Sequence, residues 1–277
     1  VLPGIGMRQF GEAYDLGDVA DRSYAARLAD VDGDGDLDVV VSNDAPDPKR
    51  LYLNDGRGRF RPGSDFGRPE WNTRNASVAD VNADGKPDVV VANRGGGANY
   101  VCFNRGGTLA DCRAFSKEPA TTITPADFNR DGLVDLAVPH RNGGQSFVYV
   151  NGGGGAFSDN ARVPFGSPNA QIRMTDAADL DGDGKLDIVA IDETTGVAVY
   201  FGRKDGTFAA AVRIADAMPV PYALIVADVN GDRMADIIVG HVEAPSTIYL
   251  NQGDGRHFTP VQFGDAAGTV YGFAIAD

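Results

Sequence analysis

Five short segments of the chain place oxygen-bearing side chains at alternate positions, a pattern that suits a hard cation. Each segment has Asp at positions 1, 5 and 9 and Asp or Asn at position 3. Alternate residues of a tight loop can point to one centre, and Ca²⁺ takes six to eight oxygen ligands at about 2.3–2.6 Å. The segments span residues 30–38, 80–88, 127–135, 179–187 and 228–236.

The predicted ligands are the side chains at positions 1, 3, 5 and 9 together with the main-chain oxygen at position 7. They are Asp30, Asp32, Asp34, Asp36 and Asp38 in the first segment, Asp80, Asn82, Asp84, Lys86 and Asp88 in the second, Asp127, Asn129, Asp131, Leu133 and Asp135 in the third, Asp179, Asp181, Asp183, Lys185 and Asp187 in the fourth, and Asp228, Asn230, Asp232 and Asp236 in the fifth. Carboxylate-rich cages made entirely of protein favour Ca²⁺ over Mg²⁺. The alternative is a set of turns that bind no metal, because Asp and Gly favour turns in any case.

The fifth segment departs from the pattern at position 6. The other four have glycine there, where the loop turns sharply, whereas the fifth has Arg233. We expect about five Ca²⁺ sites. Arg233 adds a side chain at the turn and a positive charge beside the ligands, so we expect the site in the fifth segment to be the weakest or to stay empty. The ions are expected to be structural, because they neutralise clustered carboxylates and bind the folded state selectively.

The segments recur with a nearly constant period. Their first residues are 50, 47, 52 and 49 positions apart, and alanine precedes each of them. After each segment come a run rich in β-branched residues, a stretch with an aromatic residue, a glycine-rich turn and, in most repeats, a Phe. Four short strands per period without helical periodicity predict one antiparallel four-stranded sheet per repeat. Such sheets form the blades of a β-propeller, an all-β fold.

Phe-Gly pairs accompany the acidic segments at Phe66-Gly67, Phe165-Gly166 and Phe263-Gly264. With the repeated D-x-[D/N]-x-D-G-x-x-D segments, they make the chain resemble the FG-GAP/VCBS repeat family over nearly its whole length. The resemblance implies a calcium-bearing propeller, as in integrin α-subunit heads and many secreted bacterial proteins. It implies no particular activity, because one fold hosts many functions.

Residues 1–277 are expected to form a single propeller domain. Five repeats are complete, and a sixth is split between residues 1–10, which align with a third strand and the turn after it, and residues 272–277, which align with a first strand. An open ring exposes strand edges, so we expect a chain truncated at its C-terminal end, with six or seven blades in the intact ring. The alternative is that the two ends meet and close six blades, one of them incomplete. Flanking domains or a missing blade are therefore possible partners.

Charge and cysteine content restrict the partners. Acidic residues outnumber basic ones 39 to 25, giving a net charge of −14, which disfavours nucleic acid and anionic membrane surfaces. No apolar run approaches the roughly 18 residues needed for membrane insertion.

Cys102 and Cys112 lie across a predicted hairpin turn, so the two residues are close enough for a disulfide, which we expect. The alternative is two buried free thiols. A disulfide is typical of a secreted, periplasmic or cell-surface protein.

Loops at the strand ends away from the acidic segments are candidates for ligand binding, because loops on a rigid scaffold carry function. Equivalent positions there include the residues six before each opening Asp, among them Tyr24 and Tyr271, and those five and six after each closing Asp, among them Asp44. The predicted ligand-binding residues are Asn43, Trp71, Arg74, Asn93, Arg94, His140, Arg141, Arg173, Asp192, Glu193, Tyr222 and His241. Aromatic and amide groups suit sugar rings, and arginines suit a carboxylate or sulfate. The alternative is an ordinary polar rim in which Trp71 packs against a neighbouring blade.

Three functions fit these residues. The first is a calcium-stabilised extracellular binding or adhesion module that recognises a glycan or protein through the face opposite the calcium loops. The second is an enzyme, because some proteins with propellers of the family that the chain resembles are polysaccharide lyases or sugar dehydratases. In that case His140 or His241 with Tyr222 would abstract a proton next to a carboxylate neutralised by Arg74 or Arg173. The third is a structural spacer. The sequence alone leaves open whether the chain is an enzyme, since it has neither a G-x-S-x-G nor an H-E-x-x-H motif.

Overall fold

The computed structural model describes residues 13–17, 20–95 and 97–275. Within these ranges the chain is all-β: twenty strands form five antiparallel sheets of four strands each, and there is no α-helix. In the same ranges there is accordingly no helix long and apolar enough to cross a membrane. Contacts divide the chain into two compact units, residues 1–117 (unit 1) and 118–277 (unit 2).

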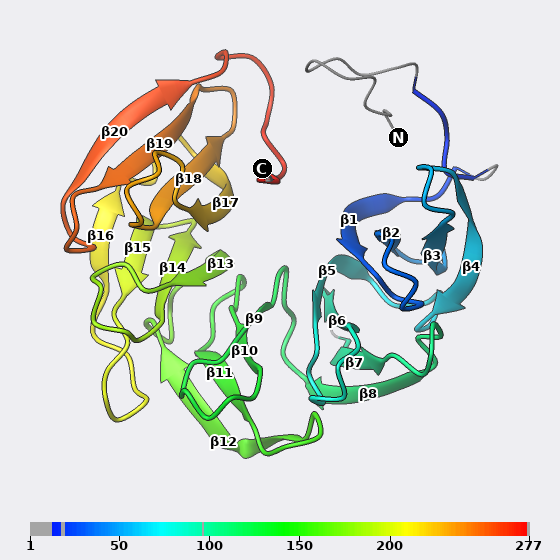
Figure 1. Ribbon diagram of the computed structural model, residues 1–277. Coiled ribbons are helices and arrows are strands. Elements are labelled where there is room, and N and C mark those ends of the chain that lie inside the picture. The colour runs from blue at the N-terminus through cyan, green and yellow to red at the C-terminus, as the bar shows by residue number, and fades with distance from the viewer. Residues whose placement is uncertain (1–12, 18–19, 96, 276–277) are drawn as a thin grey trace. The chain divides into compact units, whose positions relative to one another are not determined.

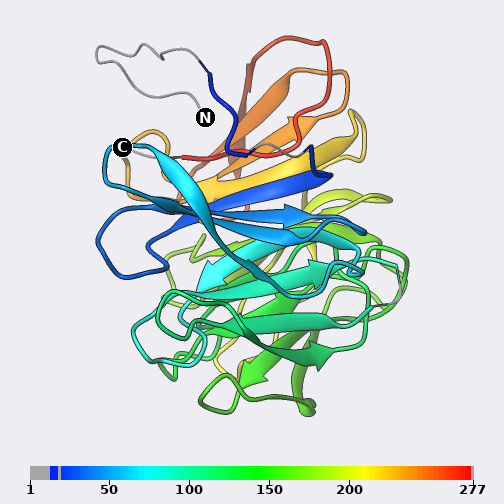
Figure 2. The same cartoon turned by 90° about the vertical axis from the view of Figure 1, so that its right-hand side faces the viewer.

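Unit 1 contains two of the sheets, blade 1 and blade 2 (Figure 1). Blade 1 is formed by β1 (Ser23–Ala29), β2 (Asp38–Asn43), β3 (Lys49–Asn54) and β4 (Phe60–Phe66). Blade 2 is formed by β5 (Thr73–Ala79), β6 (Asp88–Asn93), β7 (Asn99–Phe103) and β8 (Asp111–Ser116). In both blades each strand pairs with the next along the chain, and Figure 2 shows the strands of blade 2 (cyan to green) lying side by side.

Unit 2 contains the other three sheets, blades 3 to 5, with the same strand order (Figure 1). Blade 3 is formed by β9 (Thr124–Ala126), β10 (Asp135–Val138), β11 (Ser146–Asn151) and β12 (Phe157–Phe165). Blade 4 is formed by β13 (Ile172–Ala178), β14 (Asp187–Asp192), β15 (Gly196–Tyr200) and β16 (Val212–Ala215). Blade 5 is formed by β17 (Pro221–Ala227), β18 (Asp236–His241), β19 (Ser246–Asn251) and β20 (Phe258–Phe263).

The second strand of every blade is buried along its whole length. These strands hold most of the β-branched runs that follow the acidic segments, and such residues pack well on a pleated, covered surface. In unit 1, Val40 of blade 1 shares a hydrophobic cluster with Val89 and Val91 of blade 2. In unit 2, Ile191 of blade 4 shares one with Ile237 of blade 5. Apolar side chains therefore hold neighbouring blades of each unit face to face.

The antiparallel order separates two kinds of connection. The acidic segments, here called the Asp loops, join the first strand of a blade to its second, at the same end as the turn between the third and fourth strands. The connection from second to third strand and the start of each first strand lie at the other end, here called the opposite edge. The predicted cation sites and the predicted ligand-binding residues are thus at different ends of each sheet.

The five complete repeats are confirmed as five four-stranded antiparallel blades. The split sixth repeat finds no support. Its residues 1–10 lie outside the described residues, and residues 272–275 form no strand. Near that end, Thr269 makes only an isolated β-bridge with Val242, so the chain there lies along blade 5 without adding a sheet.

Cys102 and Cys112 face each other in the pairing of β7 with β8, and they form a disulfide. The bond links the third and fourth strands of blade 2 across the hairpin between them.

Candidate functional site

The closing Asp of every Asp loop is a buried link between the loop and its own blade. Oδ2 of Asp38 accepts a hydrogen bond from the main-chain nitrogen of Val31 at 2.8 Å, and Oδ1 accepts one from that of Asn54 at 2.9 Å. The same two bonds recur at Asp88, Asp135, Asp187 and Asp236. Burial raises the pKa of Asp135 and of Asp187 to about 6, because desolvation disfavours the charged carboxylate.

The opening Asp of each loop shapes its turn. Asp228 accepts hydrogen bonds of 2.7, 3.2 and 2.8 Å from the main-chain nitrogens of Gly231, Asp232 and Arg233. At position 6 the glycines of the first four loops have φ between 81° and 94°, and Arg233 has a φ of 70°. Arg233 therefore follows the same backbone path as those glycines. The fifth loop keeps the shape of the others. The weaker cation binding expected there rests on the positive charge of Arg233 and on the strain of a non-glycine residue at a positive φ.

Two of the five Asp loops bring three carboxylates close enough to share a cation. In each, one oxygen of the Asp at positions 1, 3 and 9 lies within 4.8 Å of the other two. The two clusters are Asp30, Asp32 and Asp38 in blade 1, and Asp179, Asp181 and Asp187 in blade 4. In each cluster one oxygen, Oδ1 of Asp32 or Oδ1 of Asp179, is buried without a hydrogen-bond partner. A buried acceptor without a partner is one that a cation would satisfy, so these residues fit Ca²⁺.

The remaining three Asp loops have Asn at position 3 and form no such cluster in the part of the chain that the structure describes. The Asn side chain instead donates to the Asp at position 5, as from Asn82 to Asp84 at 3.2 Å. The same bond joins Asn129 to Asp131 and Asn230 to Asp232. An amide oxygen is also a cation ligand, but these loops offer one carboxylate fewer. The predicted ligand sets are therefore not equivalent.

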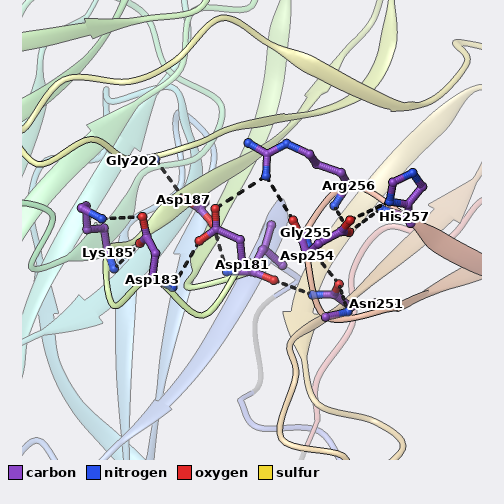
Figure 3. A network of polar contacts seen from close by, with 12 residues as sticks. Asp181, Asp183, Lys185, Asp187, Gly202, Asn251, Asp254, Gly255, Arg256 and His257 are labelled. Atoms are coloured by element: carbon purple, nitrogen blue, oxygen red, sulfur yellow. Dashed lines mark hydrogen bonds and ion pairs between the residues drawn. The ribbon is translucent and has the colours of Figure 1, made fainter.

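A turn of the following blade covers the Asp loop of blade 4 (Figure 3). Nδ2 of Asn251, at the end of β19, donates to the main-chain oxygen of Leu180 at 2.8 Å, and Nη1 of Arg256 lies 3.7 Å from Oδ2 of Asp181. In unit 1 the side chain of Asn104 donates to the main-chain oxygen of Val31, also at 2.8 Å. The two loops with three clustered carboxylates are thus each bound by an asparagine of the next blade. Neither asparagine was predicted from the sequence.

At the opposite edge, a β-bulge re-aims one residue of the first strand in four blades. The pairing of β13 with β14 shifts between Ile172 and Met174, which makes Arg173 the extra residue. The corresponding extra residues are Tyr24 in β1, Arg74 in β5 and Tyr222 in β17. A bulge turns a side chain away from the regular alternation of a strand. All four are residues six before an opening Asp, which the sequence predicted to be equivalent.

In unit 1 the bulges bring an arginine and a tyrosine of neighbouring blades together. Cζ of Arg74 lies 4.1 Å from the ring centroid of Tyr24, and Nη2 of Arg74 lies 3.4 Å from Oδ2 of Asp44. Nε of Arg74 and Oδ1 of Asp44 are both buried without a partner. One guanidinium therefore faces this carboxylate, and the ammonium group of Lys49 also interacts with it electrostatically.

Unit 2 holds a larger group, to which all three of its blades contribute. Cζ of Arg173 lies 3.4 Å from the ring centroid of Tyr222, and Nη1 of Arg173 donates to Oε1 of Glu193 at 3.0 Å. Nε of Arg141 donates to the same oxygen at 2.8 Å. Tyr271 meets Tyr222 edge-on, with 5.1 Å between the ring centroids. These five residues, Arg141, Arg173, Glu193, Tyr222 and Tyr271, are here called the Arg–Tyr cluster.

The carboxylate at the centre of the Arg–Tyr cluster is ionised. Burial alone would raise the pKa of Glu193, but the hydrogen bonds from Arg141 and Arg173 outweigh it and hold that pKa below its usual value. Four of the predicted ligand-binding residues, Arg141, Arg173, Glu193 and Tyr222, are therefore assembled at one place. Tyr271, noted at an equivalent position in the sequence, joins them.

Other predicted ligand-binding residues hold loops of their own blades. Nδ2 of Asn43 donates to the main-chain oxygen of Pro48 at 2.6 Å, and Nδ2 of Asn93 donates to that of Ala98 at 2.7 Å. Asp192 accepts a bond from the main-chain nitrogen of Thr194 at 2.9 Å. These three side chains are buried. The main-chain nitrogen of Arg94 donates to the oxygen of Asn72 at 2.9 Å.

Trp71 packs within unit 1, as the alternative interpretation expected. Its ring stacks on Tyr100 with 3.9 Å between centroids, and it contacts the hydrophobic cluster that blades 1 and 2 share. The stacked pair lines a groove of about 250 Å³, with Asp65 and Arg68 among its other lining residues. This volume is below the range of about 300–1,000 Å³ that is usual for ligand pockets.

Neither predicted histidine is hydrogen-bonded to Tyr222 in the described residues. Nε2 of His140 is buried without a partner, and Nδ1 of His241 is bonded to the main-chain oxygen of Pro245 at 2.9 Å. Burial lowers the pKa of both histidines, so both are neutral at pH 7. No hydrogen bond in the described residues therefore links either histidine to the Arg–Tyr cluster.

Solved structures of similar fold come from unrelated settings. One is an Agrocybe aegerita lectin that recognises non-reducing terminal N-acetylglucosamine, with a TM-score of 0.67 and 23% identity, covering 94% of this chain and 73% of the lectin chain. A second is BBS1N in complex with ARL6DN, with a TM-score of 0.53 and 13% identity, covering 91% of each chain. A third is the Vibrio cholerae biofilm matrix protein Bap1, with a TM-score of 0.49 and 17% identity, covering 88% of this chain and 40% of Bap1. At these identities the likeness concerns the fold alone.

No curated protein matches the chain. The FG-GAP-like repeat model matches it in four overlapping copies, at residues 30–91, 80–138, 127–190 and 179–239, and these copies span most of the chain. The matches begin at successive opening Asp residues, and each covers an Asp loop and the strands that follow it. By its repeats and its four-stranded blades, the chain belongs to the FG-GAP-like repeat family of β-propeller proteins.

Proposed function

We propose that this protein is a calcium-stabilised saccharide-binding module that works outside the cytoplasm and binds its ligand at the opposite edge. The observation that carries the proposal is the Arg–Tyr cluster. Tyr222 and Tyr271 supply aromatic surface, and Arg141, Arg173 and Glu193 supply donors and acceptors within hydrogen-bond distance of one another. A few polar groups beside aromatic surface are typical of small-ligand sites.

A saccharide is favoured over a protein ligand for two reasons. Tyr271 is 76% exposed, so it offers an aromatic ring next to charged hydrogen-bonding groups. In addition, the structural neighbour with the TM-score of 0.67 is a lectin for terminal N-acetylglucosamine. A protein ligand would bury a wider surface around the same residues. A binding experiment distinguishes this alternative from a saccharide ligand.

Calcium is proposed to act on the scaffold and not on the ligand. In unit 2 the Asp loops lie at the far end of each sheet from the Arg–Tyr cluster, and ions in the Asp loops would stabilise the blades. Of the five sites proposed, those of blades 1 and 4 are expected to be the tightest, because each gathers three carboxylates and leaves one oxygen buried without a partner. The disulfide between Cys102 and Cys112 supports an oxidising compartment, as in a secreted, periplasmic or cell-surface protein.

A glycan array probed with the calcium-loaded protein tests the proposal. Tyr271→Ala is expected to weaken binding about tenfold, because it removes exposed ring surface, and exposure makes it safe for folding. Arg213→Ala, an exposed arginine on β16 outside the cluster, is the matched control and should bind as the unmodified protein does. Binding that survives Tyr271→Ala unchanged, or an array without any bound glycan, would contradict the proposal.

A further inference from the structure

Guanidinium groups outnumber carboxylates at the centre of the Arg–Tyr cluster. Oε1 of Glu193 receives Nε of Arg141 at 2.8 Å, Nη2 of Arg141 at 2.6 Å and Nη1 of Arg173 at 3.0 Å. Two cations thus share one anion through a single oxygen. The corresponding group of unit 1 has one arginine, Arg74, for one carboxylate, Asp44.

The two arginines keep donors that Glu193 does not use. Nη1 of Arg141 and both Nε and Nη2 of Arg173 make no hydrogen bond or ion pair in the described residues. None of these atoms is among the buried polar atoms without partners, unlike Nε of Arg74 in unit 1. The side chain of Arg141 is 22% exposed and that of Arg173 is 10% exposed, so a ligand would reach Arg141 more readily than Arg173. Guanidinium nitrogens in a planar fork match the two oxygens of a carboxylate.

The carboxylate of Asp192, which precedes Glu193 in the chain, is directed into its own turn. Oδ1 of Asp192 accepts the main-chain nitrogen of Thr194 at 2.9 Å and the hydroxyl of Thr194 at 2.6 Å, and it also accepts the main-chain nitrogen of Gln171 at 3.4 Å. These donors stabilise its charge locally. In a chain whose net charge is −14, the two guanidinium groups therefore leave one net positive charge at the cluster, although Oε2 of Glu193 also makes no hydrogen bond in the described residues.

The aromatic surface next to these donors belongs to Tyr271. Arg173 covers the ring of Tyr222 at 3.4 Å, whereas Tyr271 touches Tyr222 only through an edge-on contact and is 76% exposed. A ligand that stacks on Tyr271 and turns an anionic group toward Arg141 and Arg173 would use both features at once.

We infer that the Arg–Tyr cluster selects an acidic saccharide, one whose ring packs on Tyr271 while its carboxylate or sulfate binds Arg141 and Arg173. The inference rests on the saccharide-binding function proposed above and adds the charge of the ligand. The same sign of charge on protein and ligand would slow their approach, so recognition depends on this local excess of guanidinium.

Calorimetric titration of the calcium-loaded protein tests the inference. Three oligosaccharides of equal length serve as probes: one neutral, one with uronic acid residues, and one sulfated. We expect the acidic probes to bind at least about tenfold more tightly than the neutral one, and a higher NaCl concentration to reduce this preference. The comparison of the two acidic probes distinguishes a carboxylate from a sulfate as the preferred group.

Variants assign the preference to the cluster. Arg141→Gln should bring the affinity for the acidic probes to within about twofold of the neutral one, and Arg141→Lys should restore part of the difference, because lysine keeps the charge without the fork. Arg213→Gln is the matched control and should leave all three affinities unchanged. Circular dichroism melting of each variant shows whether it is folded, and Tyr271→Ala offers a second route if Arg141→Gln does not fold.

Two outcomes would overturn the inference and separate it from the proposed function. Equal affinity for neutral and acidic probes, lost in Tyr271→Ala, would keep the saccharide site and refute its selection of acidic ligands. A preference for acidic probes that Arg141→Gln leaves intact would place the anion elsewhere. Failure of the folded, calcium-loaded protein to bind any probe would count against the proposed function itself.

Discussion

The side-chain amide of Asn251 donates a hydrogen bond of 2.8 Å to the main-chain oxygen of Leu180, and this bond ties the last turn of blade 5 to the Asp loop of blade 4 (Figure 3). Leu180 is also held from its own side, because its main-chain nitrogen donates to the closing Asp187 at 2.9 Å. Asn104 and Val31 repeat the arrangement in unit 1. A cation in either loop would therefore act on the junction with the next blade as well as on its own hairpin.

The first prediction concerns this junction. Asn251→Ala removes the side-chain bonds to the main-chain oxygens of Leu180 and Ala235, and the acceptor of the main-chain nitrogens of Gly253 and Gly255. It should therefore lower the free energy of unfolding by at least about 1–3 kcal/mol. Asn251→Gly should also lower the free energy of unfolding. Blade 4 has glycine at the corresponding position, where Gly202 makes only the main-chain bond to Asp187. Urea denaturation measures both. Gln252→Ala, at the exposed neighbouring position, is the control, and an unchanged midpoint in Asn251→Ala would refute the link.

The second prediction concerns the closing Asp. The two carboxylate oxygens of Asp187 accept hydrogen bonds from the main-chain nitrogens of Leu180 and Gly202. Asp187→Asn replaces one of these oxygens with an NH2 group, which cannot accept, so one of the two bonds is lost. We expect a loss of about 1–3 kcal/mol in the free energy of unfolding without calcium, and a weakened response to calcium. Asp183→Asn, whose carboxylate is at the exposed end of the same loop, should cost less than about 0.5 kcal/mol. Equal losses in the two variants would show that the buried bonds are not what matters.

The third prediction concerns Arg233. Arg233→Gly relieves a non-glycine residue at φ 70° and removes a positive charge beside the loop carboxylates. It should raise the free energy of unfolding by about 1 kcal/mol without calcium and add a tighter calcium site. Melting with EGTA and with CaCl₂, together with a calorimetric count of sites, provides the measurement. Weaker calcium binding by Arg233→Gly than by the unmodified protein would refute this account of the fifth loop.

The fourth prediction concerns pH. Burial holds the pKa of His140 below its usual value, so the unfolded chain binds a proton more readily than the folded one at this residue. The stability due to neutral His140 is present above about pH 6.5 and is lost as the pH falls below it. His140→Phe should make the decline of the melting temperature between about pH 7 and 5 shallower, and the part due to His241, whose pKa burial also lowers, should remain. The exposed His257 is the control, and His257→Asn should leave the decline in place; a decline unchanged by His140→Phe would exclude this histidine as its source.

The sequence predicted the parts of the structure that repeat locally. The acidic segments and the β-branched runs after them gave the Asp loops and the buried second strands, because both patterns depend on neighbours in the chain. The equivalence of Tyr24, Arg74, Arg173 and Tyr222 was also visible from their spacing. What placed them in contact was a bulge in each first strand, and a bulge depends on the pairing with the next strand, which spacing does not encode.

Contacts between blades were beyond the sequence for the same reason. Arg141 and Glu193 are 52 positions apart, and Asn251 and Leu180 are 71 apart, so no local pattern joins them. Trp71 was predicted as a ligand-binding residue because it lies in the loop beside the equivalent positions, and its ring stacks on Tyr100 inside unit 1. Polar residue types indicate a functional edge, and only the tertiary pairing decides which of them remain free for a ligand.

The most direct test is a crystal structure of the calcium-loaded protein soaked with a uronic acid oligosaccharide. We predict a sugar ring packed on Tyr271, with its carboxylate bound by Arg141 and Arg173, and cations in the Asp loops of blades 1 and 4. Sugar density in the groove beside Trp71 instead, with the guanidinium nitrogens of Arg141 and Arg173 facing only water, would contradict the account.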